Sequence, residues 1–277
     1  MLAVALVGGI LLASSAMADV TPAVRADLAP TGTVRAAINY GNAILATKER
    51  ATGESRGVAV DLIHDIGERL GVPAAIVPYD SVAVMGDAAP TGAWDIAFLG
   101  SDPAREKLMG FTAAYLEIEA TYLVPGASPL RTAAEVDRDG VRVAAPARAN
   151  YELYLSRNLK RAKLVSTASA DAAFEMLAKG QVEALAGLTQ SLLGLAPKLS
   201  GSRLVDGRFM GVQQSIAVPK GKEAGLRYLR AVVEDAKKSG LVARAIERTG
   251  AKGVSVAPPR AVTRSPPDGE PAAAEPK

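Results

Sequence analysis

The sequence contains no cysteine and a single histidine among its 277 residues. The missing thiols exclude disulfides, thiol catalysis and cysteine metal sites, and the lone imidazole excludes a histidine-rich metal site. We therefore expect a fold that depends on its apolar core alone. Aromatic residues make up 4% of the chain, so alanine and valine carry much of that core. His64 lies on the polar side of an expected helix and is interpreted as a surface residue.

Strong charge of one sign is also missing. The net charge is +3, and basic residues are interleaved with acidic ones, without a basic stripe or an aromatic platform. We therefore expect a solvated surface and no nucleic-acid partner. Hydrophobic content of 49% is typical of a soluble globular protein, and the length allows one large domain or two lobes. The sequence contains no Gly-x-Ser-x-Gly elbow, phosphate loop or metal-ligand spacing, so no cofactor and no metal are expected.

The first eighteen residues contain no charged side chain. Their apolar run, Leu2 to Ala13, is short for a membrane span and leads to Ala16-Met17-Ala18, an A-x-A cleavage pattern. This predicts a secretory signal peptide over residues 1–18, with a missing basic n-region as a departure and an uncleaved anchor as the alternative. Residues 257–277 are polar and rich in proline, which predicts a disordered tail.

Between these ends, strands alternate with helices in two series. The first series has expected strands over 33–39, 74–80 and 94–99 and helices over 57–70 and 81–88. The second has strands over 140–146, 163–168 and 182–188 and helices over 150–159, 170–179 and 190–198. Extended segments over 203–209 and 212–218 precede a helical region, 222–249, that is interrupted at Gly240. This alternation predicts parallel α/β sheets, whose ligands usually lie beyond the carboxyl ends of strands.

One segment, Trp94 to Val124, places an arginine where an anion is expected. Asp102-Pro103 is a strong helix start, with aspartate as the N-cap, so that Arg105 falls in the first turn. A cation is disfavoured at this partly positive helix end unless an anion joins it, and free N–H groups would bind the same anion. We predict a carboxylate site here, with a surface arginine on a short helix as the alternative.

In order and spacing, several motifs together resemble the bacterial extracellular solute-binding proteins of polar-amino-acid type, which feed ABC importers. The resemblance covers about residues 30–250. The matching segments are INYGN (38–42), GESRGVAVDL (53–62), LGV (70–72), WDIAFLGSDPAR (94–105), GFTAAYL (110–116), TYLVPG (121–126), GVRVAAPARANYELYL (140–155) and VEALAGLTQSL (182–192). The resemblance implies an α/β Venus-flytrap fold. Lobe 1 would hold residues 19–121 plus 217–250 and lobe 2 residues 125–213, with hinge strands at 121–124 and 214–218.

The resemblance also implies a ligand site between the lobes. Arg105 would grip a ligand carboxylate together with the strand end formed by Leu99, Gly100 and Ser101. The other implied contacts are Asn39, Tyr40 and Asn42 in the loop after the first strand, Arg148, Asn150 and Tyr151 at a helix start of lobe 2, and Thr189 after a later strand. For each of these, an ordinary turn or a side chain in water is the alternative. Trp94 is expected to pack inside lobe 1.

Three positions depart from the family pattern. Asp102 replaces a threonine, and its charge would either cap the helix or weaken the attraction for an anion. Arg148 and Ala149 stand where the family often has Gly-Ser or Gly-Thr, so Arg148 either adds a second cation or points to water. Leu188 and Thr189 replace the aspartate that often meets a ligand ammonium. Either another acid serves, or the ligand is not a simple α-amino acid.

The expected function is therefore to bind a small solute without catalysing a reaction. A periplasmic monomer would bind an amino acid or a related small carboxylate and deliver it to an ABC permease in the inner membrane. The alternative is an enzyme on the same scaffold, since a few relatives are cyclohexadienyl dehydratases. That activity needs an acid poised in the cleft, and Glu152 is the one acid we place near the lobe 2 loop. A free-standing sensory protein is the third interpretation.

Overall fold

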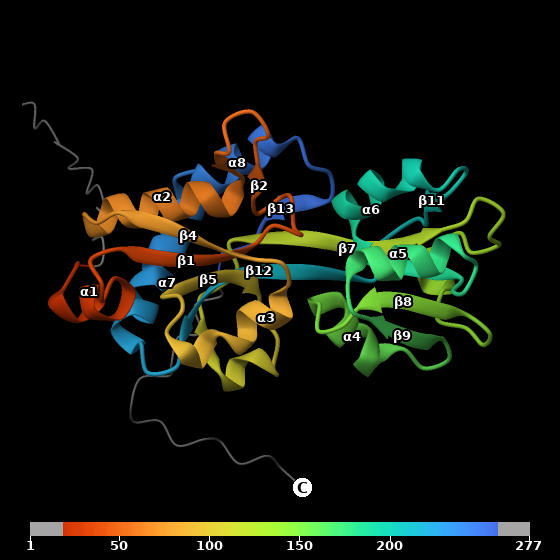
Figure 1. Cartoon of the computed structure of the whole chain (residues 1–277), viewed down its shortest axis with the longest axis horizontal. Coiled ribbons are helices and arrows are strands. Elements are labelled where there is room, and N and C mark those ends of the chain that lie inside the picture. The colour runs from red at the N-terminus through yellow and green to blue at the C-terminus, as the bar shows by residue number, and fades with distance from the viewer. Residues whose placement is uncertain (1–18, 260–277) are drawn as a thin grey trace, which may run out of the picture.

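Two groups of strands and helices lie on either side of a pair of long crossing strands (Figure 1). This computed structural model describes residues 19–259. The predicted signal peptide, and residues 260–277 of the predicted tail, lie outside the described residues. The predicted two-lobed α/β fold with two hinge strands is confirmed.

Lobe 1 is built on three parallel strands. β1 (Val34–Asn39) lies between β4 (Ala74–Tyr79) and β5 (Ile96–Gly100) and pairs in parallel with both. Its helices are α1 (Pro22–Leu28), α2 (Val58–Leu70), α3 (Val82–Asp87), α7 (Glu223–Lys238) and α8 (Leu241–Thr249). Its short elements are β2 (Thr47–Lys48), β3 (Ser55–Arg56), β6 (Met109–Phe111) and the 3₁₀ turns Ala89–Thr91 and Arg105–Lys107.

Lobe 2 repeats the parallel arrangement. β8 (Arg142–Pro146) pairs in parallel with β9 (Lys163–Thr167) and with β10 (Ala184–Leu188). Its helices are α4 (Asn150–Asn158), α5 (Ala170–Ala178) and α6 (Thr189–Leu195). The 3₁₀ turns Ala133–Glu135 and Ala196–Lys198 and the short strand β11 (Arg203–Leu204) complete this side.

The crossing strands are β7 (Leu116–Val124) and β12 (Met210–Pro219), which pair antiparallel from Met210 opposite Ala120 to Gln214 opposite Leu116. β12 continues beside β5 of lobe 1, and β7 continues beside β10 of lobe 2. One sheet therefore runs through both lobes in the order β4-β1-β5-β12-β7-β10-β8-β9. The carboxyl ends of β5 and β10 consequently lie beside this hinge.

Each lobe has its own apolar core. In lobe 1, the apolar residues Leu62, Ile63 and Ile66 of α2 are fully buried, and Gly71, at φ +64°, ends that helix in the left-handed conformation. Trp94 is 1% exposed, and its indole N–H donates to the Met85 carbonyl at 3.1 Å, as expected for a lobe 1 core residue. In lobe 2, Tyr122, Val143 and Val205 belong to a separate cluster. Each lobe therefore has a packed interior against which the hinge can move.

Two local expectations change. The helix predicted from Asp102 is a single 3₁₀ turn, Arg105–Lys107, because β6 begins at Met109 and leaves no length for an α-helix. The chain also stays packed beyond the end of α8. β13 (Val254–Val256) pairs with β7, and the N–H of buried Ala257 donates to the Tyr115 carbonyl at 3.2 Å. The packed part of the chain therefore includes Ala257, the first residue of the predicted tail.

Candidate functional site

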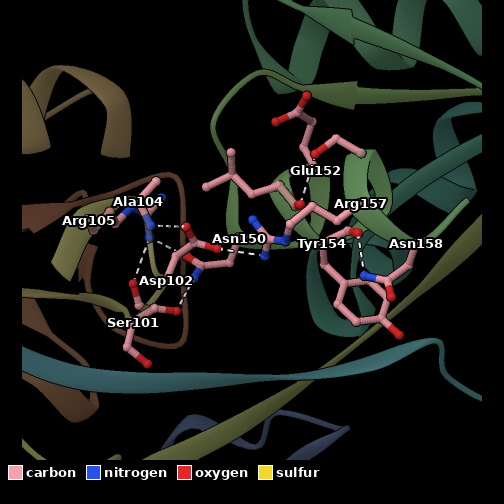
Figure 2. Close-up of polar contacts among 12 residues, drawn as sticks. Ser101, Asp102, Ala104, Arg105, Asn150, Glu152, Tyr154, Arg157 and Asn158 are labelled. Atoms are coloured by element: carbon pink, nitrogen blue, oxygen red, sulfur yellow. Dashed lines mark hydrogen bonds and ion pairs between the residues drawn. The ribbon is translucent and has the colours of Figure 1, made fainter. Parts of the chain in front are cut away.

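Arg105 lies at the contact between the two lobes, just beyond the end of β5. Its side chain is 8% exposed. Nη1 donates to the Gly100 carbonyl at 2.7 Å and to Asn150 Oδ1 at 2.5 Å, and Nη2 donates to the Arg148 carbonyl at 2.7 Å. Figure 2 shows Arg105 and Asn150 facing each other, one from each lobe. The guanidinium therefore joins the end of β5 to the loop between β8 and α4.

The charge of Arg105 has no anionic partner in direct contact. Within residues 19–259, Arg105 forms no ion pair, and the oxygens bonded to it belong to neutral carbonyl and amide groups. Burial lowers the pKa of its guanidinium to about 10, with the Asp102 charge opposing this effect and the Arg148 charge adding to it. The group stays charged at neutral pH. A buried cation that is surrounded only by dipoles favours an incoming anion.

Asp102, which could have weakened that attraction, is occupied elsewhere. Its side chain is 4% exposed. Oδ1 accepts the Ala104 N–H at 2.8 Å, and Oδ2 accepts Arg157 Nη2 at 2.8 Å. Because Arg157 lies on α4 of lobe 2, this ion pair also crosses between the lobes. Asp102 thus orders the turn before Arg105 and has its own cation.

Arg148 adopts a backbone conformation that favours glycine. Its φ is +62°, in the left-handed region, which matches its place where the family often has glycine. Its N–H donates to Glu152 Oε2 at 2.9 Å, and Glu152 Oε1 accepts the Ser166 hydroxyl at 2.6 Å. The side chain makes a two-pronged pair with Asp87 of α3, at 2.9 and 2.7 Å. Arg148 therefore reaches lobe 1, where its guanidinium is paired with Asp87.

Asn150 closes the same contact from the lobe 2 side. Its Nδ2 donates to the Ser101 carbonyl at 2.9 Å, while its Oδ1 accepts from Arg105. A Cβ placed on Gly100 would approach the Asn150 amide group to 2.6 Å, so only glycine leaves room for this side chain. Gly100, Ser101, Arg105, Arg148 and Asn150 thus form one cluster, which we call the Arg105 cluster. Leu99 packs instead in an apolar cluster of lobe 1.

The structure places the loop after β1 in local contacts. Asn39 Oδ1 accepts the Gly41 N–H at 2.8 Å, and buried Asn42 Oδ1 accepts the Ile44 N–H at 3.2 Å. The Tyr40 hydroxyl lies 2.5 Å from Ser55 Oγ, and Lys48 Nζ lies 5.7 Å from the centre of its ring. Both asparagines shape their own turn, and Tyr40 packs toward the β2–β3 hairpin.

The remaining predicted residues fill space between the lobes. Tyr151 packs against the apolar clusters of both lobes, and burial raises the pKa of its hydroxyl. Leu188, at the end of β10, packs with the lobe 1 cluster. Thr189 lies against the segment after α8, since a Cβ on Gly253 would be 3.1 Å from Thr189 Cβ. Here Lys252 N–H also donates to Gln190 Oε1 at 3.0 Å.

A cavity of about 690 Å³ opens next to Tyr40, between the β2–β3 hairpin, α2 and α8. Ser55, which bonds Tyr40, is in its wall, together with the exposed His64 and the Asp61–Arg248 ion pair at 2.6 Å. Gln190 of α6 completes the wall from lobe 2. Arg105 is not among the lining residues. The surface position expected for His64 is confirmed.

Sequence analysis missed two residues that connect the lobes, Asp87 and Arg157. They lie 61 and 55 positions from their partners, Arg148 and Asp102, so no local spacing relates them. The sequence held one signal for the Asp87 contact: Arg148 stands where the family often has glycine. In residues 19–259, no group of three or more His, Asp or Glu side chains is placed to hold a metal ion. None of the helices described there combines the length and apolar character needed to cross a bilayer.

Comparison with protein families gives one match. Residues 36–250 match the family described as bacterial extracellular solute-binding proteins, family 3. A comparison with curated protein sequences found no match.

Solved structures share the fold at low sequence identity. A mutant of the arginine-binding protein ArgBP from T. maritima matches with TM-score 0.68 and 21% identity, over 82% of this chain and 99% of that one. An amino acid ABC transporter substrate-binding protein from Streptococcus pneumoniae, bound to L-arginine, matches with TM-score 0.69 and 20% identity, over 85% and 99%. The ancestral amino acid-binding protein AncCDT-1, a precursor of cyclohexadienyl dehydratase, matches with TM-score 0.65 and 22% identity, over 78% and 94%.

Proposed function

Because the chain belongs to the bacterial extracellular solute-binding proteins of family 3, we propose that it captures an amino acid or a related small carboxylate between its lobes. The observation that carries this proposal is the buried cation of Arg105, which is bonded only to neutral oxygens. A carboxylate could accept two parallel N–H bonds from this guanidinium and neutralise its charge. Closing of the lobes then holds the solute.

The Arg105 cluster supports a contact from both lobes. Leu99, Gly100 and Ser101 bring the end of β5 to the solute, and Arg148, Asn150 and Tyr151 bring the start of α4. Asn39, Tyr40, Asn42 and Thr189 are proposed for the opposite end of the solute. Because Leu188 packs against the lobe 1 core and is apolar, the solute ammonium, if there is one, needs an acceptor other than the aspartate usual in amino-acid binders.

Delivery to an ABC permease is the proposed biological role. Several structural neighbours bind amino acids, and one is an ABC transporter protein bound to L-arginine. We propose a periplasmic monomer that is secreted through residues 1–18 and has a lobe 1 of 19–121 plus 217–250 and a lobe 2 of 125–213. Capture and release require no chemical step, cofactor or metal.

An enzyme on this scaffold is the second candidate, because one structural neighbour is a precursor of cyclohexadienyl dehydratase. The acid expected for such chemistry, Glu152, is 7% exposed, and its two oxygens accept bonds from Arg148 N–H and the Ser166 hydroxyl. These bonds shape the loop before α4. The arrangement favours a structural role for Glu152 and therefore favours binding over catalysis.

Isothermal titration calorimetry of the purified protein with the twenty amino acids and small dicarboxylates tests the proposal. We expect at least one carboxylate to bind, and Arg105→Ala to weaken that binding by about 100-fold or more, because two charge-assisted bonds are lost. The matched control is Arg227→Ala, at an exposed arginine of α7. Equal affinity in Arg105→Ala would sink the assignment, and turnover of prephenate or arogenate would favour the enzyme.

A further inference from the structure

The two lobes are held together by the protein's own polar groups at the place proposed for the solute. Around Arg105, five polar contacts between described residues cross the gap: Arg105 with Asn150, Arg105 with the Arg148 carbonyl, Asn150 with the Ser101 carbonyl, Arg157 with Asp102, and Arg148 with Asp87. The last two are ion pairs that involve side chains about half exposed, so they lie toward the rim. The first three lie inside, and the buried guanidinium makes two of them.

Asn150 lies opposite Arg105 and accepts a hydrogen bond from its guanidinium, as a bound carboxylate would. Its amide oxygen accepts from Nη1 at 2.5 Å, and its amide nitrogen donates to Ser101 O at 2.9 Å, so both of its polar atoms are bonded to lobe 1. Gly100 makes room for it, because a Cβ there would come within 2.6 Å of the amide. Both Nη1 hydrogens are already donated, so a carboxylate that binds end-on through Nη1 and Nη2 has to displace this amide.

The loop that carries Asn150 is held in position. Arg148 keeps its left-handed conformation at φ +62° while Glu152 accepts its N–H at 2.9 Å and Asp87 binds its side chain. Strained residues of this kind persist where the surroundings fix them, and they concentrate at functional sites. The Arg148 carbonyl consequently points at Arg105 Nη2, 2.7 Å away, and Asn150 follows two residues later.

We propose that Asn150 is an internal competitor for the anion site of Arg105. The solute-free protein closes on its own amide group, and a carboxylate binds only by displacing it. This inference rests on the proposed function, because it assigns a specificity-determining residue to the same site. The observed solute affinity then equals the intrinsic affinity of the Arg105 site multiplied by the fraction of molecules in which Asn150 does not hold that site. Solutes that offer Arg105 only a neutral acceptor cannot displace the Asn150 amide and do not bind, whereas charged carboxylates can displace it.

Two substitutions at this one position have opposite expected effects. Asn150 was proposed above as a solute contact, and in this scheme its amide leaves Arg105 when the solute binds. Asn150→Ala therefore removes the competitor at little cost to the bound state, so solute affinity should rise about tenfold and the solute-free protein should open more often. Asn150→Asp supplies a charged oxygen to Arg105 but can no longer donate to the Ser101 carbonyl. Because the charge-assisted bond is the stronger of the two, solute affinity should fall by about tenfold or more and the solute-free protein should stay closed. A residue that merely supports the fold would weaken binding in both cases.

The control is Asn158→Ala at the other end of α4. Asn158 makes a local bond to the Tyr154 carbonyl at 2.8 Å and is exposed (Figure 2). This substitution removes the same amide from the same helix without touching the contact between the lobes. It should change neither affinity nor closure.

Two measurements on the full chain separate this inference from the proposed function. The first is the distance between fluorophores attached through Glu68→Cys on α2 and Asp171→Cys on α5, both exposed, in a chain that has no other cysteine. It is recorded without solute. The second is calorimetric titration with L-arginine and L-glutamine and, where neither binds, with the remaining amino acids and small dicarboxylates.

A longer distance in Asn150→Ala than in the wild type and in Asn158→Ala supports the inference, with or without a solute that binds. If distances are unchanged, the inference is wrong even when the wild type binds an amino acid. It is also overturned when a solute binds the wild type and Asn150→Ala binds it more weakly. Absence of binding to every carboxylate, together with the longer distance, contradicts the proposed function and leaves the internal closure supported.

Discussion

Replacing Arg148 by glycine and by alanine tests the backbone conformation on which the contact between the lobes depends. At φ +62°, a side chain with a Cβ costs about 1–2 kcal/mol relative to glycine in the folded state. Glycine gains more backbone entropy on unfolding, which costs about 0.5–1 kcal/mol. Both variants lose the pair with Asp87. Because its side chains are 52% and 60% exposed, that pair contributes about 0.2–1 kcal/mol.

These terms predict different outcomes for the two variants. Arg148→Ala keeps the strain and loses the ion pair, so its free energy of unfolding should fall by about 0.2–1 kcal/mol. Arg148→Gly loses the same pair but is relieved of the strain, so it should be more stable than Arg148→Ala by about 0–1.5 kcal/mol, the strain less the entropy cost, and close to the wild type. The pair itself is measured separately with Asp87→Asn.

Urea unfolding followed by circular dichroism at neutral pH measures these differences, provided that the denaturant slope stays the same in all variants. Because the rim pair is exposed, the Asp87→Asn effect should shrink when salt is added, while the difference between glycine and alanine should not. Higher stability of the alanine variant than of the glycine variant would refute the left-handed conformation of Arg148 and the way it positions Asn150.

Three further substitutions have defined outcomes. Arg157→Ala removes the cation that pairs with the 4%-exposed Asp102, so the free energy of unfolding should fall by about 1–2 kcal/mol. The control, Lys179→Ala, removes an exposed ion pair at the end of α5 and should change the free energy of unfolding little. Equal effects of the two substitutions in urea unfolding would contradict the role of Asp102. The Arg148 guanidinium lowers the pKa of Asp87, so the stabilising pair is complete above about pH 4 and is lost as the pH falls through that lowered pKa. Asp87→Asn should therefore lie below the wild type at pH 7 and match it in strong acid, and a gap that is the same at both pH values in urea titrations would argue against the pair. Arg105→Lys keeps a charge but loses the planar fork, so calorimetry should give a solute affinity between those of the wild type and Arg105→Ala, and full affinity would exclude two-pronged binding.

Local patterns were enough to predict most of the elements. The helices expected over 57–70 and 81–88 and the interruption at Gly240 follow from local features, and the structure has them. The alternation of strands and helices predicted parallel pairing, which holds within each lobe. β13 and the β2–β3 hairpin were missed, because strands of two or three residues carry too little pattern to be distinguished from loops.

The candidate site was predictable as a set of neighbours but not as a set of contacts. The spacing of Arg105 after β5 and the place of Asn150 at the start of α4, after β8, put both residues beyond strand ends. The argument from a helix amino end was wrong, because only one 3₁₀ turn follows Asp102. The pairs Arg148–Asp87 and Arg157–Asp102 depend on how the hinge sets one lobe against the other, and that information is not contained in any local segment.

Mass spectrometry of small molecules released by denaturing the purified full chain tests the central claim most directly. We expect the wild type and Arg227→Ala to release a compound with a carboxylate group, and we expect Arg105→Ala to release none of it. A released compound without a carboxylate, or the same compound in equal amount from Arg105→Ala, would contradict the claim that Arg105 binds the solute.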